Sequence, residues 1–291
     1  MNRLIAAIAL AATLQLGTAE AAPTMPPVTD PPSTISIPGK FVWFDLITPD
    51  PVAAQAFYGK VFGWTFQPVA DASDYTAIAA SGRLIGGVLR PVVSQDSPAG
   101  SRWLSFVSVR DMRKAMSKLG GMGFTTLLPA TKVPGRGTHA VMRDPQGAIL
   151  GLLKSASGDP RDEPVGPGEF FWVDLYARDV VTASAAYAAI GYNVVPADEG
   201  EGDRMLLESN GYARAGITQM PTDAREPGWL PYVQVEDVAA TVAAAQAAGG
   251  KLLMAPDPAV LDGNVAVIGD PLGGVIGVIH WQAEGEQEAN P

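Results

Sequence analysis

Three segments of this chain occur twice, in the same order. FVWFDL (41–46) returns as FFWVDL (170–175), and WLSFVSVRD (103–111) returns as WLPYVQVED (229–237). DPQGAILGLL, which begins at Asp144, returns as DPLGGVIGVI from Asp270. Three collinear matches indicate a tandem duplication. The stretch between the copies is rich in Gly, Pro and charge, so we expect domains at 40–155 and 169–282 joined by a linker at 156–168.

Each half divides again into two similar units. In the first unit, a strand at 40–48 precedes Asp50 and Pro51, which suit a helix N-cap and first turn. Apolar residues then recur at helical spacing up to Gly63, and short strands follow near 64–69, 75–79 and 84–90. The pattern restarts at Trp103. The sequence therefore predicts an α+β fold of two tandem domains, each with paired βαβββ units forming a curved mixed sheet with helices on its convex face.

Side-chain alternation assigns the faces of the first strand in each half. One face is entirely apolar, so we expect it to lie under the helices: Val42, Phe44 and Leu46, then Phe171, Val173 and Leu175. The other face is expected to line a concave cleft: Phe41, Trp43, Asp45 and Ile47, then Phe170, Trp172, Asp174 and Tyr176. Phe106 and Tyr232 hold matching concave positions on the strands that begin at Trp103 and Trp229.

Four segments resemble known proteins: DPVAAQAFYGKVFGW (50–64), GWLPYVQVEDVAATVAAAQAAGG (228–250) and the two DPxG segments. In these segments the chain resembles the vicinal oxygen chelate superfamily, also called the glyoxalase/bleomycin-resistance/extradiol-dioxygenase family. The resemblance covers nearly all of 40–154 and 169–281. It implies a divalent metal held by His, Gln or Glu on the concave face. At the implied ligand positions this chain has Trp43 and Trp172, Leu104 and Leu230, Gly151 and Gly277, and glycines near Gly86 and Gly216. These side chains cannot bind a cation, so we expect no metal and no cofactor.

The same substitutions suggest a hypothesis for the clefts. Trp43 would face Gly151, and Trp172 would face Gly277, with each indole in the space that a metal would occupy. The indoles are then either platforms for a planar ligand or packing that closes the site. The expected ligand-binding residues are Trp43, Phe106, Gly151, Trp172, Tyr232 and Gly277.

Asp45 and Asp174 need a separate explanation, because an inward-facing carboxylate must be paired, hydrogen-bonded or hydrated. Each is a candidate catalytic base with a raised pKa, or a polar anchor for a ligand. Each is equally a candidate for a structural carboxylate tied to a buried Arg or to backbone N–H groups. The sequence leaves these interpretations open.

Three functions follow from these features. The first is a metal-independent protein that binds a small apolar or aromatic molecule. The second is an enzyme of the superfamily, a lyase, isomerase or dioxygenase, most plausibly with metal-free acid–base chemistry through Asp45 or Asp174. The third is an interaction module with vestigial clefts. A monomer or a homodimer is expected, because the duplication supplies a domain pair within one chain.

The ends of the chain indicate export. Arg3, the apolar run 4–17 and Ala19-Glu20-Ala21 fit a signal peptide at 1–21, so the mature protein is expected to be secreted or periplasmic, without membrane attachment after cleavage. Residues 22–39, with six prolines, predict an extended tether, and 283–291 an acidic tail. The net charge of −10 argues against a nucleic-acid partner.

Overall fold

The computed structural model describes residues 23–91, 100–197, 204–220 and 226–281. Domain 1 contains β1 (Phe41–Ile47), α1 (Pro51–Phe62), β2 (Thr65–Pro68), β3 (Tyr75–Ala80), β4 (Arg83–Leu89), β5 (Arg102–Ser108), α2 (Met112–Gly121), β6 (Thr125–Val133), β7 (Gly137–Arg143) and β8 (Ile149–Ser155). Domain 2 contains β9 (Phe170–Ala177), α3 (Val180–Ala188), β10 (Asn193–Pro196), β11 (Met205–Ser209), β12 (Tyr212–Gln219), β13 (Gly228–Gln234), α4 (Val238–Ala247), β14 (Lys251–Met254), the 3-10 turn η2 (Leu261–Gly263), β15 (Val265–Gly269) and β16 (Val275–Ile279).

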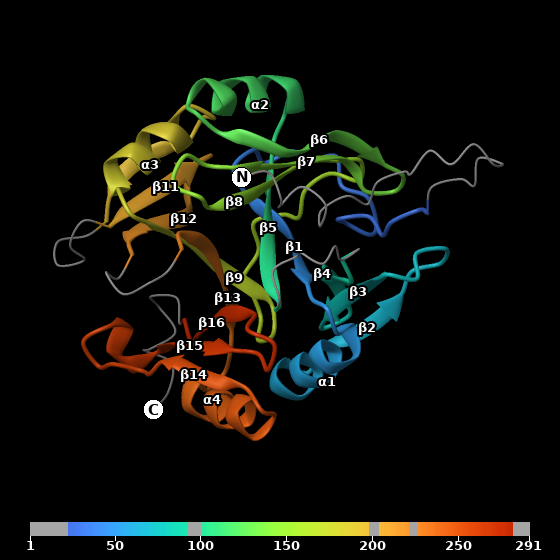
Figure 1. Cartoon of the computed structure of the whole chain (residues 1–291), viewed down its shortest axis with the longest axis vertical. Helices are drawn as coiled ribbons and strands as arrows, with labels where there is room; N and C mark the ends of the chain where they lie inside the picture. The colour runs from blue at the N-terminus through green and yellow to red at the C-terminus, as the bar shows by residue number, and fades with distance from the viewer. Residues whose placement is uncertain (1–22, 92–99, 198–203, 221–225, 282–291) are drawn as a thin grey trace.

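Each domain forms an eight-stranded mixed sheet within these described residues (Figure 1). The strand order is β2-β3-β4-β1-β5-β8-β7-β6 in domain 1 and β10-β11-β12-β9-β13-β16-β15-β14 in domain 2. The first strands of the two units pair antiparallel at the centre, and each also pairs parallel with the last strand of its own unit. The prediction of an α+β fold with tandem, paired βαβββ units is confirmed.

All four described α-helices begin at an aspartate. The side chains of Asp50, Asp111, Asp179 and Asp237 each accept a hydrogen bond from the backbone N–H three residues later, at 2.9 to 3.1 Å. This arrangement satisfies an N–H group that the first helical turn leaves without a partner. Helix α1 ends at Gly63, which adopts the left-handed conformation that favours glycine.

The two domains pack against each other through the sheet faces that carry the helices, and two hydrophobic cores are shared between them. One core joins residues of the second unit of domain 1 to the first unit of domain 2, and the other joins the two outer units. Accordingly α1 contacts α4, and Figure 1 shows α2 and α3 together at the opposite end of the molecule. At the centre, the rings of Phe44 and Phe170 stack with centroids 3.9 Å apart.

The two DPxG segments form turns that also join the domains. Asp270 Oδ1 accepts backbone hydrogen bonds from Leu272 and Gly274 inside its own turn. Its Oδ2 accepts a hydrogen bond of 3.1 Å from the Tyr58 hydroxyl on α1 of the other domain, and Trp103 Nε1 donates to that hydroxyl at 3.1 Å. Asp144, Tyr187 and Trp229 repeat this arrangement with the domains exchanged. Trp103 and Trp229 therefore belong to the contact between domains.

The alternation predicted for β1 and β9 is wrong at the start of each strand. Phe41 packs on Trp229 in the shared core, with ring centroids 5.0 Å apart, whereas Val42 lies with the concave-side residues. In β9, Phe170 points to the shared core and Phe171 to the concave side. Both strands shift register at this point against their central neighbour. Such a β-bulge adds one residue, so side chains before it exchange faces.

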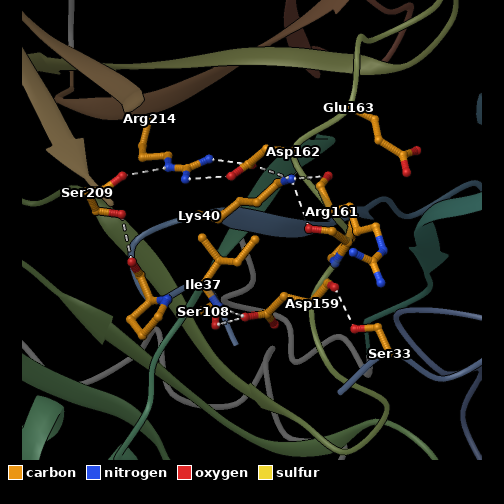
Figure 2. A network of polar contacts seen from close by, with 12 residues as sticks. Ser33, Ile37, Lys40, Ser108, Asp159, Arg161, Asp162, Glu163, Ser209 and Arg214 are labelled. Carbon is orange, nitrogen blue, oxygen red and sulfur yellow. Dashed lines mark hydrogen bonds and ion pairs between the residues drawn. The ribbon is translucent and has the colours of Figure 1, made fainter. Parts of the chain in front are cut away.

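Residues 23–39, here called the N-terminal strap, lie against domain 1. Met25, Val28 and Ile37 of the strap are all buried. The strap also contacts the linker (Figure 2). The Ser33 hydroxyl donates a hydrogen bond to the Asp159 backbone carbonyl, and the Asp159 carboxylate accepts hydrogen bonds from Ile37 N and the Ser108 hydroxyl. The predicted signal peptide and acidic tail fall outside the described residues. In the part of the chain that is described, no helix has the length and apolar character that crossing a bilayer requires.

Candidate functional site

In domain 1, the repeated Trp and Asp form one buried polar cluster on the concave side. Trp43 Nε1 donates to Asp45 Oδ1 at 2.8 Å, and the Tyr75 hydroxyl on β3 donates to the same oxygen at 2.7 Å. Gly87 of β4 pairs with Asp45, and a Cβ at Gly87 would collide with the Tyr75 hydroxyl. The glycine therefore provides the space for this contact.

Arg136 supplies the positive charge of this cluster. It lies in the turn between β6 and β7, and its guanidinium carbon is 3.7 Å from the centre of the Trp43 ring, a cation–π contact. It also donates to the Tyr75 hydroxyl at 3.4 Å. Burial raises the pKa of Asp45, while the charge of Arg136 opposes that rise. The carboxylate is thus compensated within the protein.

The space that remains beside this cluster is small. A cavity of about 50 Å³ is lined by Asp45, Tyr75, Arg136, His139 and Met25, together with apolar side chains that include Phe106. Burial, with a further contribution from the Arg136 charge, lowers the pKa of His139 to about 4. Trp43 is only 1% exposed. As it stands, this cleft is filled by the protein's own side chains.

Domain 2 repeats the Trp–Asp pair but completes it differently. Trp172 Nε1 donates to Asp174 Oδ1 at 2.8 Å, as in domain 1, and Arg204 Nη2 donates to the same oxygen at 3.1 Å. Strand pairing gives Arg204 the place, just before β11, that Tyr75 holds in β3. Burial raises the pKa of Asp174, and the Arg204 charge opposes the rise. The two domains therefore obtain their arginine from different elements.

Aromatic side chains line the rest of the domain 2 cleft. The hydroxyls of Tyr176 and Tyr232 are 3.0 Å apart, and burial raises the pKa of both. Phe171 stacks on Trp281, with ring centroids 5.8 Å apart, and Trp281 is 47% exposed. Trp172 is half-buried, whereas its counterpart in domain 1 is buried. The aromatic faces of this cleft are thus partly exposed, at Phe171, Trp172 and Trp281, whereas the Tyr232 side chain is only 4% exposed.

The residues present do not fit a divalent metal. A Cβ at Gly151 would collide with the ring of Phe106, and one at Gly277 with the ring of Tyr232. Leu104 and Leu230 offer no donor atom. The described residues contain no group of three His, Cys, Asp or Glu side chains that could hold a metal.

The expectation that each indole faces a glycine is not met directly, because another aromatic residue lies between them in the sheet. Phe106 pairs with both Trp43 and Gly151 along the sheet, and its ring lies over the glycine. Tyr232 has the same relation to Trp172 and Gly277. The concave aromatics on the central strands, rather than the tryptophans, occupy the space over the glycines.

The structure brings most of the predicted site residues together within each domain. Trp43 contacts Asp45, and Phe106 covers Gly151; Trp172, Asp174 and Tyr232 form the equivalent group. Sequence reasoning missed Tyr75, Arg136 and Arg204. Aligning the third strands of the two halves would have marked Tyr75 and Arg204 as equivalent, but a turn arginine carries no local signal.

Comparisons with known proteins match these features. A family model described as "Bleomycin resistance protein-like N-terminal" matches residues 40–81. The anthracycline biosynthesis protein DauV of Streptomyces sp. (strain C5) is 29% identical over 231 residues, which are 74% of this chain and 84% of that protein. The putative glyoxylase CFP32 of Mycobacterium bovis is 27% identical over 244 residues, 81% of this chain and 93% of that protein.

Solved structures share the fold at lower identity. A Mn(II)-bound glyoxalase from Novosphingobium aromaticivorans superposes with a TM-score of 0.59 and 16% identity, over 84% of this chain and 83% of that one. A variant of homoprotocatechuate 2,3-dioxygenase from B. fuscum gives a TM-score of 0.61 and 14% identity, over 90% and 77%. The chain therefore belongs to the vicinal oxygen chelate superfamily, as a member with two tandem domains of paired βαβββ units.

Proposed function

We propose that this protein is an exported, metal-independent binding protein that holds a planar, hydroxylated aromatic molecule in the cleft of domain 2. The observation that carries the proposal is the contrast between the two clefts. Both contain the same Trp–Asp pair, with the indole nitrogen 2.8 Å from the carboxylate. In domain 1 a cavity of only about 50 Å³ remains and Trp43 is buried, whereas in domain 2 Phe171 and Trp172 are half-buried and the neighbouring Trp281 is exposed.

The chemistry of the domain 2 cleft suits such a ligand. Aromatic faces provide a large contact area at low entropic cost. The hydroxyls of Tyr176 and Tyr232 can each donate or accept, and their mutual distance of 3.0 Å places them as one polar contact point. Asp174 and Arg204 add a compensated pair of charges beside Trp172. A planar ring with hydroxyl or carbonyl groups at its edge would satisfy both kinds of surface.

The names of the relatives agree with this class of ligand. DauV and the DnrV protein of Streptomyces peucetius are named for anthracycline biosynthesis, and anthracyclines are planar polycyclic aromatic compounds. DnrV is 29% identical over 231 residues, 74% of this chain.

An enzymatic function is the second candidate, and one observation favours it. Burial raises the pKa of Asp174, which brings a carboxyl group closer to the range where it can exchange protons with a substrate. Asp45 has the same property but lies in the filled cleft. Turnover of a bound ligand without added metal, lost in Asp174→Asn, would favour this candidate over simple binding.

The test measures binding of 1,8-dihydroxyanthraquinone to the mature protein by isothermal titration calorimetry. We expect one saturable site whose affinity falls at least tenfold in Asp174→Asn, because a hydrogen bond to a charged group contributes about 1.5–3 kcal/mol. The matched control is Asp45→Asn, the equivalent change in domain 1, which should leave this affinity unchanged. Equal losses in both variants, or no saturable site in the wild type, would reject the proposal. An absence of both binding and turnover would favour an interaction module.

Export is tested on the protein purified from the producing cells. Native mass spectrometry should give the mass of residues 22–291, with or without an organic molecule. Cell fractionation should place that species outside the cytoplasm. A retained leader in a cytoplasmic protein would contradict export without affecting the binding proposal.

A further inference from the structure

The cleft of domain 1 is occupied by the protein's own N-terminal strap. The Met25 side chain is 5% exposed and packs against Tyr75 and Val133. It lines the same cavity of about 50 Å³ as Asp45 and Arg136. Tyr75 in turn donates its hydroxyl to Asp45 at 2.7 Å. A methionine side chain therefore lies where a molecule entering the domain 1 cleft would contact the polar cluster.

The seat for the strap is built into domain 1. Met25 N donates to Pro134 O at 2.9 Å, and Arg136 Nε donates to Pro26 O at 2.6 Å. Gly135 has φ +77°, and a Cβ there would collide with Met25 O. Glycine is the residue that permits both this backbone conformation and this close approach. The turn that carries Arg136 thus binds the strap backbone and holds the charge beside Trp43 at once.

A second set of contacts fixes the strap further along. The Thr29 hydroxyl donates to Ser157 O at 2.6 Å, and the Ser33 hydroxyl donates to Asp159 O at 2.8 Å (Figure 2). Gly158 has φ +83°, and a Cβ there would collide with Ser33 O. The strap is therefore held at both ends, and Met25 is placed in the cleft by backbone contacts that do not depend on its own side chain.

We infer that domain 1 contains a second small-molecule site, which the strap keeps closed with Met25 as an internal ligand. Removing the Met25 side chain would join its volume to the existing cavity. Apolar cavities of about 150 Å³ take up benzene-sized molecules. The walls supplied by Leu104, Phe106 and Val141 are apolar, and Tyr75 and Asp45 offer hydrogen-bond partners at one end. The ligand class is a single aromatic ring with one hydroxyl, for which phenol is the probe.

The experiment uses the full mature chain with Met25→Gly. Phenol is titrated by calorimetry, and Tm is followed at rising phenol concentration. We expect Met25→Gly to bind one more phenol per chain than the wild type, and its lowered Tm to rise with phenol. Adding Asp45→Asn should weaken that extra site at least tenfold. Because the readout is the difference from the wild type, phenol bound in domain 2 cancels, and the inference does not rest on the domain 2 proposal.

The matched control is Ile37→Ala. Ile37 lies on the same strap and is buried at 8% exposure, but it neither lines this cavity nor packs with its apolar walls. Ile37→Ala should lower Tm without creating a phenol site. No additional site in Met25→Gly, or an equal response in Ile37→Ala, would overturn the inference. If Met25→Gly fails to fold, Met25→Ala opens a smaller space in the same place and is judged by the same two outcomes.

Discussion

In both domains, a tryptophan and an arginine explain why an aspartate can lie in the middle of a buried strand. Asp45 and Asp174 each accept the indole N–H of the tryptophan two residues earlier, on the same side of the strand. An arginine then compensates the charge, Arg136 in one domain and Arg204 in the other. A buried charge without such partners would be costly. The Trp-x-Asp motif is therefore a local unit that a nearby cation completes.

Histidine gives this cluster a testable pH dependence. The pKa of His139 is about 4 in the folded protein and about 6.5 when unfolded. Folding depresses the pKa of His139. Its contribution to the free energy of unfolding is therefore fully present above about pH 6.5 and is lost as pH falls towards 4. The cause is burial together with Arg136. Between pH 7.5 and 4.5 we expect His139→Gln to lose about 1–2 kcal/mol less free energy of unfolding than the wild type.

Urea unfolding at the two pH values measures this difference. His280→Gln serves as the control, because that histidine lies in domain 2 and contacts the carbonyl of Val235. Parallel pH profiles for the wild type and His139→Gln would show that His139 does not carry the effect.

Among the elements, those defined by periodicity or capping were predictable. The helix at 51–62 begins after Asp50 and ends at Gly63, as the capping residues indicate. The faces of β1 and β9 were predicted correctly only beyond the bulge, because strict alternation holds no information about an inserted residue. Strand β6 extends to Val133, and the short turn between it and β7 carries Arg136.

The contacts of that turn and of the strap could not be predicted from the sequence. They depend on pairing between segments far apart in the chain, as between Pro26 and Arg136 or Thr29 and Ser157. A Pro-rich segment has no apolar period, so its composition predicts an extended chain but not the surface on which the chain lies. The filled cleft of domain 1 follows from such contacts.

The helices α1 and α3 each carry a tyrosine that joins the domains. In Tyr58→Phe, Asp270 keeps its backbone hydrogen bonds, but Trp103 Nε1 loses its acceptor. An unsatisfied polar group costs about 1–3 kcal/mol when it is buried, and Trp103 is half-buried, so we expect a loss of about 1 kcal/mol in the free energy of unfolding. Tyr212→Phe, at a position 56% exposed, should change it by less than about 0.5 kcal/mol. Equal stabilities of the two variants in urea unfolding would contradict the structural role of Tyr58.

At the scale of the whole molecule, the two domains share two hydrophobic cores, and each domain has a smaller cluster of its own on the concave side. Side chains around α1 and α4 form one cluster, and those around α2 and α3 form another. Separating the two domains would expose both clusters. The linker also holds the two domains together. Asp162 accepts hydrogen bonds from Lys40, just before β1 of domain 1, and from Arg214 on β12 of domain 2 (Figure 2).

We therefore expect Asp162 to act as a latch, meaning that its hydrogen bonds stabilise the contact between the two domains, over a defined pH range. Hydrogen bonds from Arg214 hold its pKa at about 2 in the folded protein, below the unfolded value of about 3.9. A depressed carboxyl pKa contributes stability that is present above pH 4 and is lost as pH falls towards 2. Asp162→Asn should cost up to about 2 kcal/mol in the free energy of unfolding at pH 7 and progressively less in acid.

The matched control is the neighbouring Glu163→Gln, whose side chain is 56% exposed and 3.5 Å from Arg83. An exposed pair of this kind contributes about 0–1 kcal/mol and is screened by salt. Because the Arg214 side chain is only 7% exposed, the effect of Asp162→Asn should persist in 1 M NaCl while that of Glu163→Gln disappears. A loss in Asp162→Asn that is constant from pH 7 to pH 2.5, or that vanishes with salt, would show that the latch does not work through a protected ion pair.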